Sequence, residues 1–331
     1  RLPAIIFLLA AGIAAGPLLG LLDPDALLGD LLFPLVSLAV AVILFEGSLT
    51  LRFHEIRGLG RVIRRLITWG MLITWLVTTL ATRLALGFSW EVSFLFGALM
   101  VVTGPTVIVP LLRTVRPSAA VANVLRWEGI LIDPIGATLA VLVFEFIVAG
   151  GGEGGLGTSL LVFGEIVLLG LVMGVAGGQA FGVLLRRHWI PHYLQNVAAL
   201  AAVAAVFALS NHFAEESGLL TVTVMGVWLA NQPGLDLDGI LDFKESLSVL
   251  LISVLFIVLA ARMNLALFQT LGWPSLGVFA AIQFLARPLG AQVAAWGSEL
   301  TRGERHLLAW IAPRGIVAAA ISALFALKLE E

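Results

Sequence analysis

The chain contains no cysteine and very little charge. With 0 Cys among 331 residues, disulfides and thiolate metal sites are excluded. Asp, Glu, Lys and Arg make up only 12% of the residues, roughly half the share typical of soluble domains, while hydrophobic residues reach 60% and the mean hydropathy is +1.05. The net charge is −2 and the basic residues form no patch, so a nucleic-acid partner is not expected. The composition indicates that the partner is a lipid bilayer.

The sequence also lacks the common signatures of enzymes and of ATP-driven pumps. It contains no P-loop, no Rossmann glycine fingerprint and no nucleophile elbow around a serine. The five histidines show no metal-ligand spacing, such as two histidines four residues apart on a helix. We therefore expect neither an enzyme nor a resident cofactor.

Apolar stretches long enough to cross a bilayer, about 17 to 25 residues each, recur along the whole chain. They predict an all-α polytopic membrane protein of about eleven spans. The expected spans are 2–22, 30–51, 62–86, 91–112, 121–149, 158–185, 194–213, 217–231, 243–262, 272–297 and 304–328. The connector 23–30 is acidic, and the glycine-rich stretch 150–157 is typical of a flexible loop.

The distribution of basic residues predicts the orientation of these spans. Of the 19 Lys and Arg residues, fourteen fall at Arg1 and in alternate connectors, three fall on the opposite side, and two lie inside spans. Because positive charge accumulates on the cytoplasmic side, the first residue is expected there. We expect the protein in a bacterial inner membrane. The chain begins with Arg instead of Met and stops soon after its last apolar run, so we also expect that a longer protein extends beyond it.

Two carboxylates lie deep in the fifth span, at Glu128 and Asp133. Burial of a charge in hydrocarbon is costly, so an intramembrane acid indicates ion or proton movement. A separation of five residues places the two groups about 140° apart around a helix, where they face different neighbours. Three other acids receive less weight: Glu46 is expected to be structural, and Glu145 and Glu165 to be solvated or to line a funnel.

Arg287 and Arg314 also lie inside spans, and a buried guanidinium requires a carboxylate or a cluster of carbonyls. We pair Arg287 with Glu128, an ion pair that is either purely structural or part of the site. This leaves Asp133 without a fixed countercharge, so that proton and cation binding can compete there. The alternative for Asp133 is a protonated carboxyl that is hydrogen-bonded to Thr138 or to a backbone carbonyl.

Two spans are interrupted near their middles by glycine and proline, at Gly104-Pro105-Thr106 and at Pro313-Arg314-Gly315. Proline breaks the helical ladder and glycine permits an unwound link, so each span is expected to form two half-helices. Spans four and eleven cross in opposite directions, as an inverted repeat requires. Such paired breaks indicate a transport site, whereas the alternative is a pair of proline kinks without function.

These residues resemble the monovalent cation/proton antiporters of the NhaP and NHE type, the sodium/hydrogen exchanger family. The resemblance runs over nearly the whole chain and is carried by 102-VTGPTVIVPLLR-113, 128-EGILIDPIGA-137, 284-FLARPLG-290 and 309-AWIAPRGIVAAAIS-322. These stretches are similar to the family's unwound helix, its acidic helix, its Arg helix and its second broken helix. The resemblance implies inverted repeats with two crossing broken helices, and it implies that the family's first and last helices are absent.

The resemblance also implies roles for individual residues. Asp133 corresponds to the aspartate that binds cation and proton in turn, with Thr103 and Glu128 beside it, and Glu128 and Arg287 correspond to the family's core ion pair. Scaffold and dimerisation helices are implied at 1–60 and 150–265, and a mobile core at 61–149 and 266–331. The implied activity is elevator-like exchange of Na⁺ or K⁺ for H⁺ by a homodimer. A single essential carboxylate suggests electroneutral exchange.

The chain departs from the family pattern at three positions. Gly104, Gly129 and Ile132 stand where the family has Asp, Ser and Asn, so three polar groups near the ion are absent. Three other functions remain open: a Na⁺-coupled symporter of an organic anion, a sensor or channel that no longer exchanges ions, and a membrane-embedded enzyme. The sequence contains no further polar or aromatic set for an organic solute, and no nucleophile for an enzyme.

Overall fold

The computed structural model describes residues 4–148, 153–235 and 237–312, together with positions 314, 315, 318, 322 and 325. Every regular element in this part of the chain is helical. The α-helices are α1 (Ala4–Ile13), α2 (Pro24–Leu28), α3 (Leu32–Ser48), α4 (Gly60–Arg65), α5 (Met71–Leu86), α6 (Trp90–Leu99), α7 (Pro105–Val115), α8 (Ala119–Val148), α9 (Glu153–Arg186), α10 (Gln195–Phe213), α11 (Ser217–Ala230), α12 (Asp238–Ala261), α13 (Leu265–Ala281), α14 (Arg287–Ala295) and α15 (Arg302–Trp310). π-Helical turns occupy Ala14–Leu18, Leu66–Gly70 and Ile282–Ala286, and 3₁₀ turns occupy Gly29–Leu31, Phe53–Ile56 and His192–Leu194.

The helices follow the apolar stretches of the sequence closely. Within the described residues, six helical stretches are long and apolar enough to cross a membrane, and four shorter apolar helices accompany them. The short ones include α6, which is half of a broken span, and α11, the short eighth span. Large apolar side chains point outward, with Leu84 78% and Trp273 84% exposed, as expected of a surface in contact with lipid. The all-helical polytopic fold is therefore confirmed.

Two expected loops are partly helical. The acidic connector 23–30 contains α2, which Asp23 caps by accepting hydrogen bonds from the backbone N–H groups of Asp25 and Ala26. The glycine-rich stretch 150–157 is helical from Glu153 onward, and residues 149–152 lie outside the described part. Extending α9 adds one backbone hydrogen bond per residue, and this gain offsets the low helix propensity of glycine.

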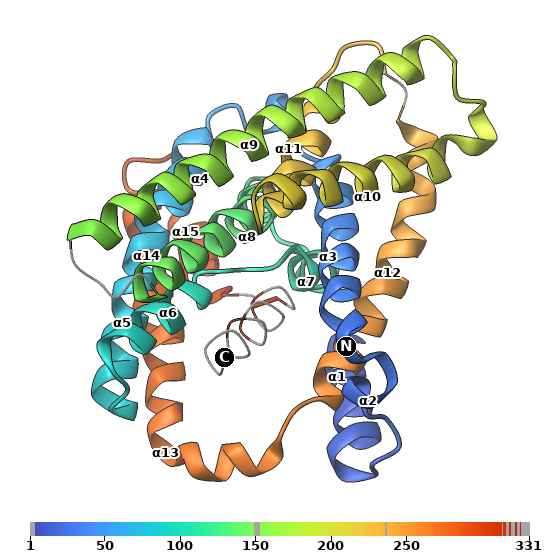
Figure 1. The fold of residues 1–331 in the computed structure, drawn as a ribbon. Helices are drawn as coiled ribbons and strands as arrows, with labels where there is room; N and C mark the ends of the chain where they lie inside the picture. Colours follow the sequence, from blue (N-terminus) through green and yellow to red (C-terminus); the bar gives the residue numbers. More distant parts are fainter. Residues whose placement is uncertain are drawn as a thin grey trace.

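The helices form two groups with α8 between them (Figure 1). In one group, α9, α10, α11, α3 and α12 pack on one another, and α1 packs on α12. In the other, α5, α6, α13 and α14 pack together, and α14 also contacts α4 and α15. Helix α8 contacts α6 and α7, and it also contacts α9 and α11. Its residues are therefore the best placed in the fold to connect the two groups.

Hydrogen bonds join the connectors that carry most of the arginines. Asn231 binds Leu51 and Phe53, Asn123 binds the Glu55 carbonyl, and Ser118 binds Glu304. We call this end of the bundle, formed by residues 49–60, 113–119, 186–194, 231–235 and 296–304, the basic end. At the other end, Arg262 forms an ion pair with Asp25 at 2.8 Å. The alternation of connectors expected from the sequence therefore agrees with these contacts.

Candidate functional site

The first break separates α6 from α7. Helix α6 ends at Leu99, and α7 begins at Pro105, with the extended residue Gly104 (φ −87°, ψ 141°) immediately before it. Thr106 follows in the first turn of α7. Proline fits the first position of a helix because its missing N–H would have no intrahelical partner there. The sequence Gly-Pro therefore starts α7 after the extended link that follows α6.

The second break follows α15. Helix α15 ends at Trp310, and Ile311 is extended (φ −88°, ψ 102°). Pro313 lies outside the described residues, and Arg314 and Gly315 lie beyond the end of the helix. The Arg314 guanidinium donates hydrogen bonds to the carbonyls of Met100, Val101 (3.3 Å) and Val102 (3.5 Å), which form the link after α6. Arg314 therefore connects the two breaks.

These contacts have a simple electrostatic origin. The last carbonyls of a helix have no intrahelical partners and carry partial negative charge. A buried guanidinium needs several acceptors, and the end of α6 supplies them. The carbonyl cluster required by an intramembrane arginine is therefore the unwound link itself.

Glu128 and Arg287 form a bidentate ion pair between α8 and α14. The Arg287 Nη2 donates to Glu128 Oε2 at 2.9 Å, and Nη1 donates to Oε1. The side chains are only 6% and 7% exposed. The third donor, Nε, binds the carbonyl of Leu308 in α15 at 3.0 Å. One guanidinium therefore ties three helices together, and bidentate geometry of this kind is specific to arginine.

Asp133 lies on the same helix but has a different environment. It is 0% exposed, and neither carboxylate oxygen has a hydrogen-bond partner among the described residues. The hydroxyl of Thr138 donates to the Pro134 carbonyl at 2.7 Å instead of to Asp133. The hydrogen bond to Thr138 that the sequence left open as an alternative is therefore absent from this structure.

Two glycines show which way Asp133 faces. Gly129 and Gly136 lie four residues before and three residues after it, so all three share one face of α8. A Cβ on Gly136 would lie 2.7 Å from Val102 Cγ2, and one on Gly129 would overlap Ile108 Cδ1 and lie 3.6 Å from the Thr103 carbonyl. The first break packs against this face, so Asp133 is directed toward the unwound link.

A small cavity lies beside the ion pair. It has a volume of about 20 Å³, room for about one water molecule, and is lined by Thr103, Glu128, Arg287 and Arg314, among others. Thr103 is 4% exposed, and its hydroxyl has no partner within the described structure. Residues of two π-helical turns, Leu66–Gly70 and Ile282–Ala286, also line it, and such turns often mark functional sites.

Apolar packing fills two of the three departures from the family pattern, at positions 129 and 132. Ile108 occupies the space that a side chain at position 129 would need, and Ile132 is 3% exposed. Sequence reasoning missed both Ile108 and Gly136. The signal that was available is the seven-residue spacing of Gly129 and Gly136 around Asp133.

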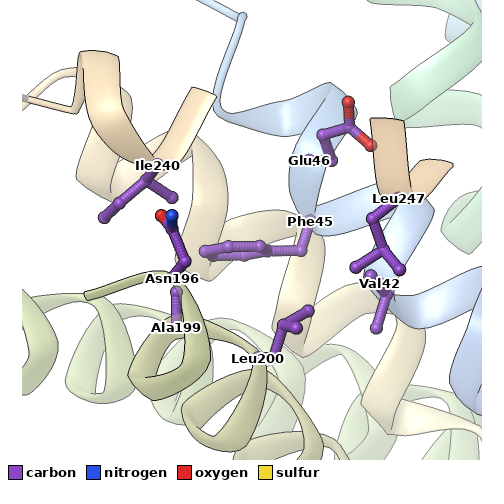
Figure 2. A pocket seen from close by; sticks show the side chains of 8 residues that line it. All are labelled: Val42, Phe45, Glu46, Asn196, Ala199, Leu200, Ile240 and Leu247. Carbon is purple, nitrogen blue, oxygen red and sulfur yellow. The ribbon is translucent and has the colours of Figure 1, made fainter. Parts of the chain in front are cut away.

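Two other cavities contain acidic side chains. Glu145, Glu165, Glu215 and Glu216 line one of about 200 Å³ at the end opposite the basic end, where Phe144 and Phe325 are stacked with centroids 4.9 Å apart. The second contains Glu46 (Figure 2) and has a volume of only about 10 Å³, less than one water molecule requires. In Figure 2 the Glu46 carboxylate points away from the Phe45 ring. Neither cavity includes Asp133 in its lining.

Broken helices that meet beside a buried carboxylate define the class of secondary transporters. The protein belongs to the sodium/hydrogen exchanger family. The family pattern described as "Sodium/hydrogen exchanger, transmembrane" matches residues 1–330. The family resemblance seen in the sequence is therefore confirmed, and the chain is an integral membrane protein related to cation/proton antiporters.

Known relatives cover most of the chain. The Na(+)/H(+) antiporter 1 of Methanocaldococcus jannaschii is 26% identical over 350 residues, which cover 99% of this chain and 79% of the relative. The K(+)/H(+) antiporter NhaP of Alkalimonas amylolytica is 26% identical over 288 residues, 86% of this chain and 50% of the relative. The solved structure of the sodium proton antiporter MjNhaP1 from M. jannaschii at pH 8 superposes with a TM-score of 0.84 at 24% identity, covering 99% of this chain and 83% of that one. The fold is shared.

Proposed function

We propose that this protein exchanges a monovalent cation, Na⁺ or K⁺, for H⁺, and that Asp133 binds the two ions in turn. The observation that carries the proposal is the contrast within α8: Glu128 is held by Arg287, whereas Asp133 is fully buried and has no hydrogen-bond partner in the described residues. A carboxylate without a fixed countercharge is free to take either a proton or a cation.

The surroundings of Asp133 supply groups that suit a cation. The unwound link places the Thr103 carbonyl against the face of α8 that holds Asp133, and the Thr103 hydroxyl has no partner within the described structure. Unwound backbone at a helix break is a common way to coordinate Na⁺ in membrane transporters. Because one carboxylate carries either one cation or one proton, each cycle moves one positive charge in each direction. Exchange is therefore electroneutral, and the transported ions are the only ligands it requires.

The packing supports a moving core. Helices of 61–149 and 266–331 pack on one another, as do those of 1–60 and 150–265. In this proposal the first set moves as an elevator-like core against the second, which forms the scaffold and the interface of a homodimer. The basic end faces the cytoplasm of a bacterial cell. The cavity lined by four glutamates lies at the opposite end, where its carboxylates attract cations.

The test is a pH-gradient dequenching assay in proteoliposomes with Na⁺, K⁺ or Li⁺. We expect cation-dependent proton movement in the native protein and none with Asp133→Asn, because the amide cannot release a proton or balance the charge of a cation. Asp30→Asn makes the same chemical change in an exposed connector and is expected to transport normally.

An active Asp133→Asn variant would overturn the assignment. Proton movement that requires an added organic anion would identify the symporter instead. Electroneutrality is checked by imposing a membrane potential with valinomycin and K⁺, which should leave the initial rate of Na⁺-driven proton movement unchanged.

A further inference from the structure

A large cavity lies between α8, α9 and α11 near the basic end. Its volume is about 600 Å³, within the range of sites that enclose small organic ligands. The cavity is thirty times larger than the one beside Glu128, and it is far larger than a monovalent cation needs. Its size therefore suits a ligand larger than the transported ions.

The deep part of this cavity is apolar. Its walls are Leu131, Pro134 and Ile135 from α8, and Leu220, Val224 and Val227 from α11. Thr223 also lines it, but its hydroxyl donates to the Leu219 carbonyl at 2.8 Å. The twelve residues from Leu220 to Asn231 span about 16 Å along α11 and its C-cap. The deep part therefore suits an extended hydrocarbon chain.

The exposed lining residues form the mouth of the cavity: Phe53, Gln179, Arg186, Trp228 and Pro233. They include polar groups and one positive charge. The Oε1 of Gln179 accepts hydrogen bonds from Trp228 Nε1 (3.1 Å) and Gln232 Nε2 (3.2 Å), so these groups bind one another. Arg186, at the last turn of α9, is exposed, and among the described lining residues it alone is charged. A cation at the mouth of an apolar cavity repels Na⁺ and attracts an anionic head group.

We propose that this cavity binds a fatty acid, with its carboxylate on Arg186 and its alkyl chain along α11 toward Pro134. The cavity has one charged group of the required sign at its open end and one continuous apolar interior, which matches a single-chain carboxylate. A guanidinium binds a carboxylate by charge-assisted hydrogen bonds, and burial of the chain supplies the hydrophobic contribution.

The bound alkyl chain lies between the two groups of helices and keeps them from moving against each other. Pro134 follows Asp133 directly on α8, and the facing walls belong to α9 and α11. This consequence rests on the proposed function: where α8 moves against α9 and α11 during exchange, an occupied cavity holds them in one arrangement and slows transport.

Binding is tested with the full chain in nanodiscs of zwitterionic lipid. Bromododecanoate is expected to quench tryptophan fluorescence, and Trp228→Phe to remove the largest part of the quenching because Trp228 lines the cavity. Arg186→Gln should raise the Kd about tenfold, the equivalent of one charge-assisted hydrogen bond. Bromododecanol should bind more weakly and show no response to Arg186→Gln.

Two variants serve as controls. Arg187→Gln makes the same charge change one residue later, where the guanidinium stacks on Trp189 at 5.5 Å outside the cavity lining, and it should leave the Kd unchanged. Ile135→Trp fills the interior and should abolish binding of both the acid and the alcohol. Quenching that is the same in Trp228→Phe and Arg186→Gln as in the native chain would overturn the site. Displacement of bromododecanoate by phosphatidylglycerol in the nanodisc would overturn the fatty acid as the ligand.

Inhibition is measured as ²²Na⁺ exchange at equal pH on both sides, because a fatty acid carries protons across a bilayer by itself. Dodecanoate should slow exchange in the native protein, and Arg186→Gln should raise the inhibitory concentration about tenfold in line with its Kd. Binding of dodecanoate without inhibition of exchange would refute this effect on transport. Lack of both Na⁺ and K⁺ exchange in the untreated native protein would refute the proposed function and leave the binding result standing.

Discussion

Glu128 and Asp133 are both buried on α8, five residues apart, yet their surroundings differ in kind. Glu128 accepts two hydrogen bonds from Arg287, and that arginine is itself held by the Leu308 carbonyl. Asp133 has no such partner in the described structure and faces an unwound link. Burial alone therefore does not distinguish the two carboxylates. The two carboxylates differ in whether a fixed positive charge pairs with them.

The substitution Arg287→Ala tests this difference between Glu128 and Asp133 with the largest expected effect. It leaves the Glu128 carboxylate buried and unpaired, which is expected to lower stability by about 3–5 kcal/mol. The measurement is the apparent Tm of the purified protein in detergent. Asp133→Asn is the matched comparison, because it removes no ion pair and should leave the Tm close to the native value. An Arg287→Ala protein as stable as the native one would show that the pair is not what distinguishes Glu128.

Gly129→Ala tests the packing that turns Asp133 toward the link. The new methyl group overlaps Ile108 Cδ1, and overpacking of this kind costs about 1–3 kcal/mol. Ile108→Val removes that Cδ1 atom and should restore both the Tm and the exchange rate in the double variant. Gly157→Ala is the control, since a Cβ there meets nothing within 4 Å and should not destabilise α9. Failure of Ile108→Val to rescue would show that the two residues do not share this space.

A third carboxylate, Glu304, is only partly buried, and its substitution should have the smallest effect on stability. Hydrogen bonds from the Ser118 hydroxyl, and then from the Thr301 backbone and hydroxyl, lower the pKa of Glu304 from its usual 4.5. The ionised group therefore stabilises the fold above pH 4.5, and this contribution is lost as the pH falls through the lowered pKa.

The measurement is the Tm of the native chain and of Glu304→Gln as a function of pH. The native chain should have a slightly higher Tm at neutral pH, and the difference should shrink as the pH drops below about 4.5. Ser118→Ala should reduce the difference as well. A difference that grows in acid would contradict the assigned sign. Solvent screening keeps the effect small because Glu304 is only partly buried at the protein surface.

Much of the fold follows from local patterns in the chain. Long apolar runs predict the helices to within a few residues, and Gly-Pro predicts the start of α7 at Pro105 because proline fits that position. The glycine-rich stretch after 150 is misleading, because the helix from Glu153 gains backbone hydrogen bonds that a local propensity does not count. A glycine-rich stretch therefore predicts a loop less well next to a long apolar helix than in a soluble domain.

The candidate site was only partly predictable. The scarcity of charge made the intramembrane carboxylates and arginines stand out, and few partners were available for any one of them. The contacts of Arg314 with the carbonyls of Met100, Val101 and Val102 were not predictable, because backbone acceptors carry no sequence signal. The filling of the space beside Gly129 by Ile108 depends on how α7 lies against α8, which spacing along one helix does not encode.

The sequence by itself determined that this is a helical membrane protein with two broken spans and a charge at Asp133, because apolar length, proline and an intramembrane acid each have local physical consequences. Only the tertiary structure decided which guanidinium neutralises which acceptor and which face of α8 meets the unwound link. Those outcomes depend on the packing of segments more than 150 residues apart, as with Glu128 and Arg287, whose separation is 159 residues. The cavity at Arg186 likewise exists only because three helices meet there.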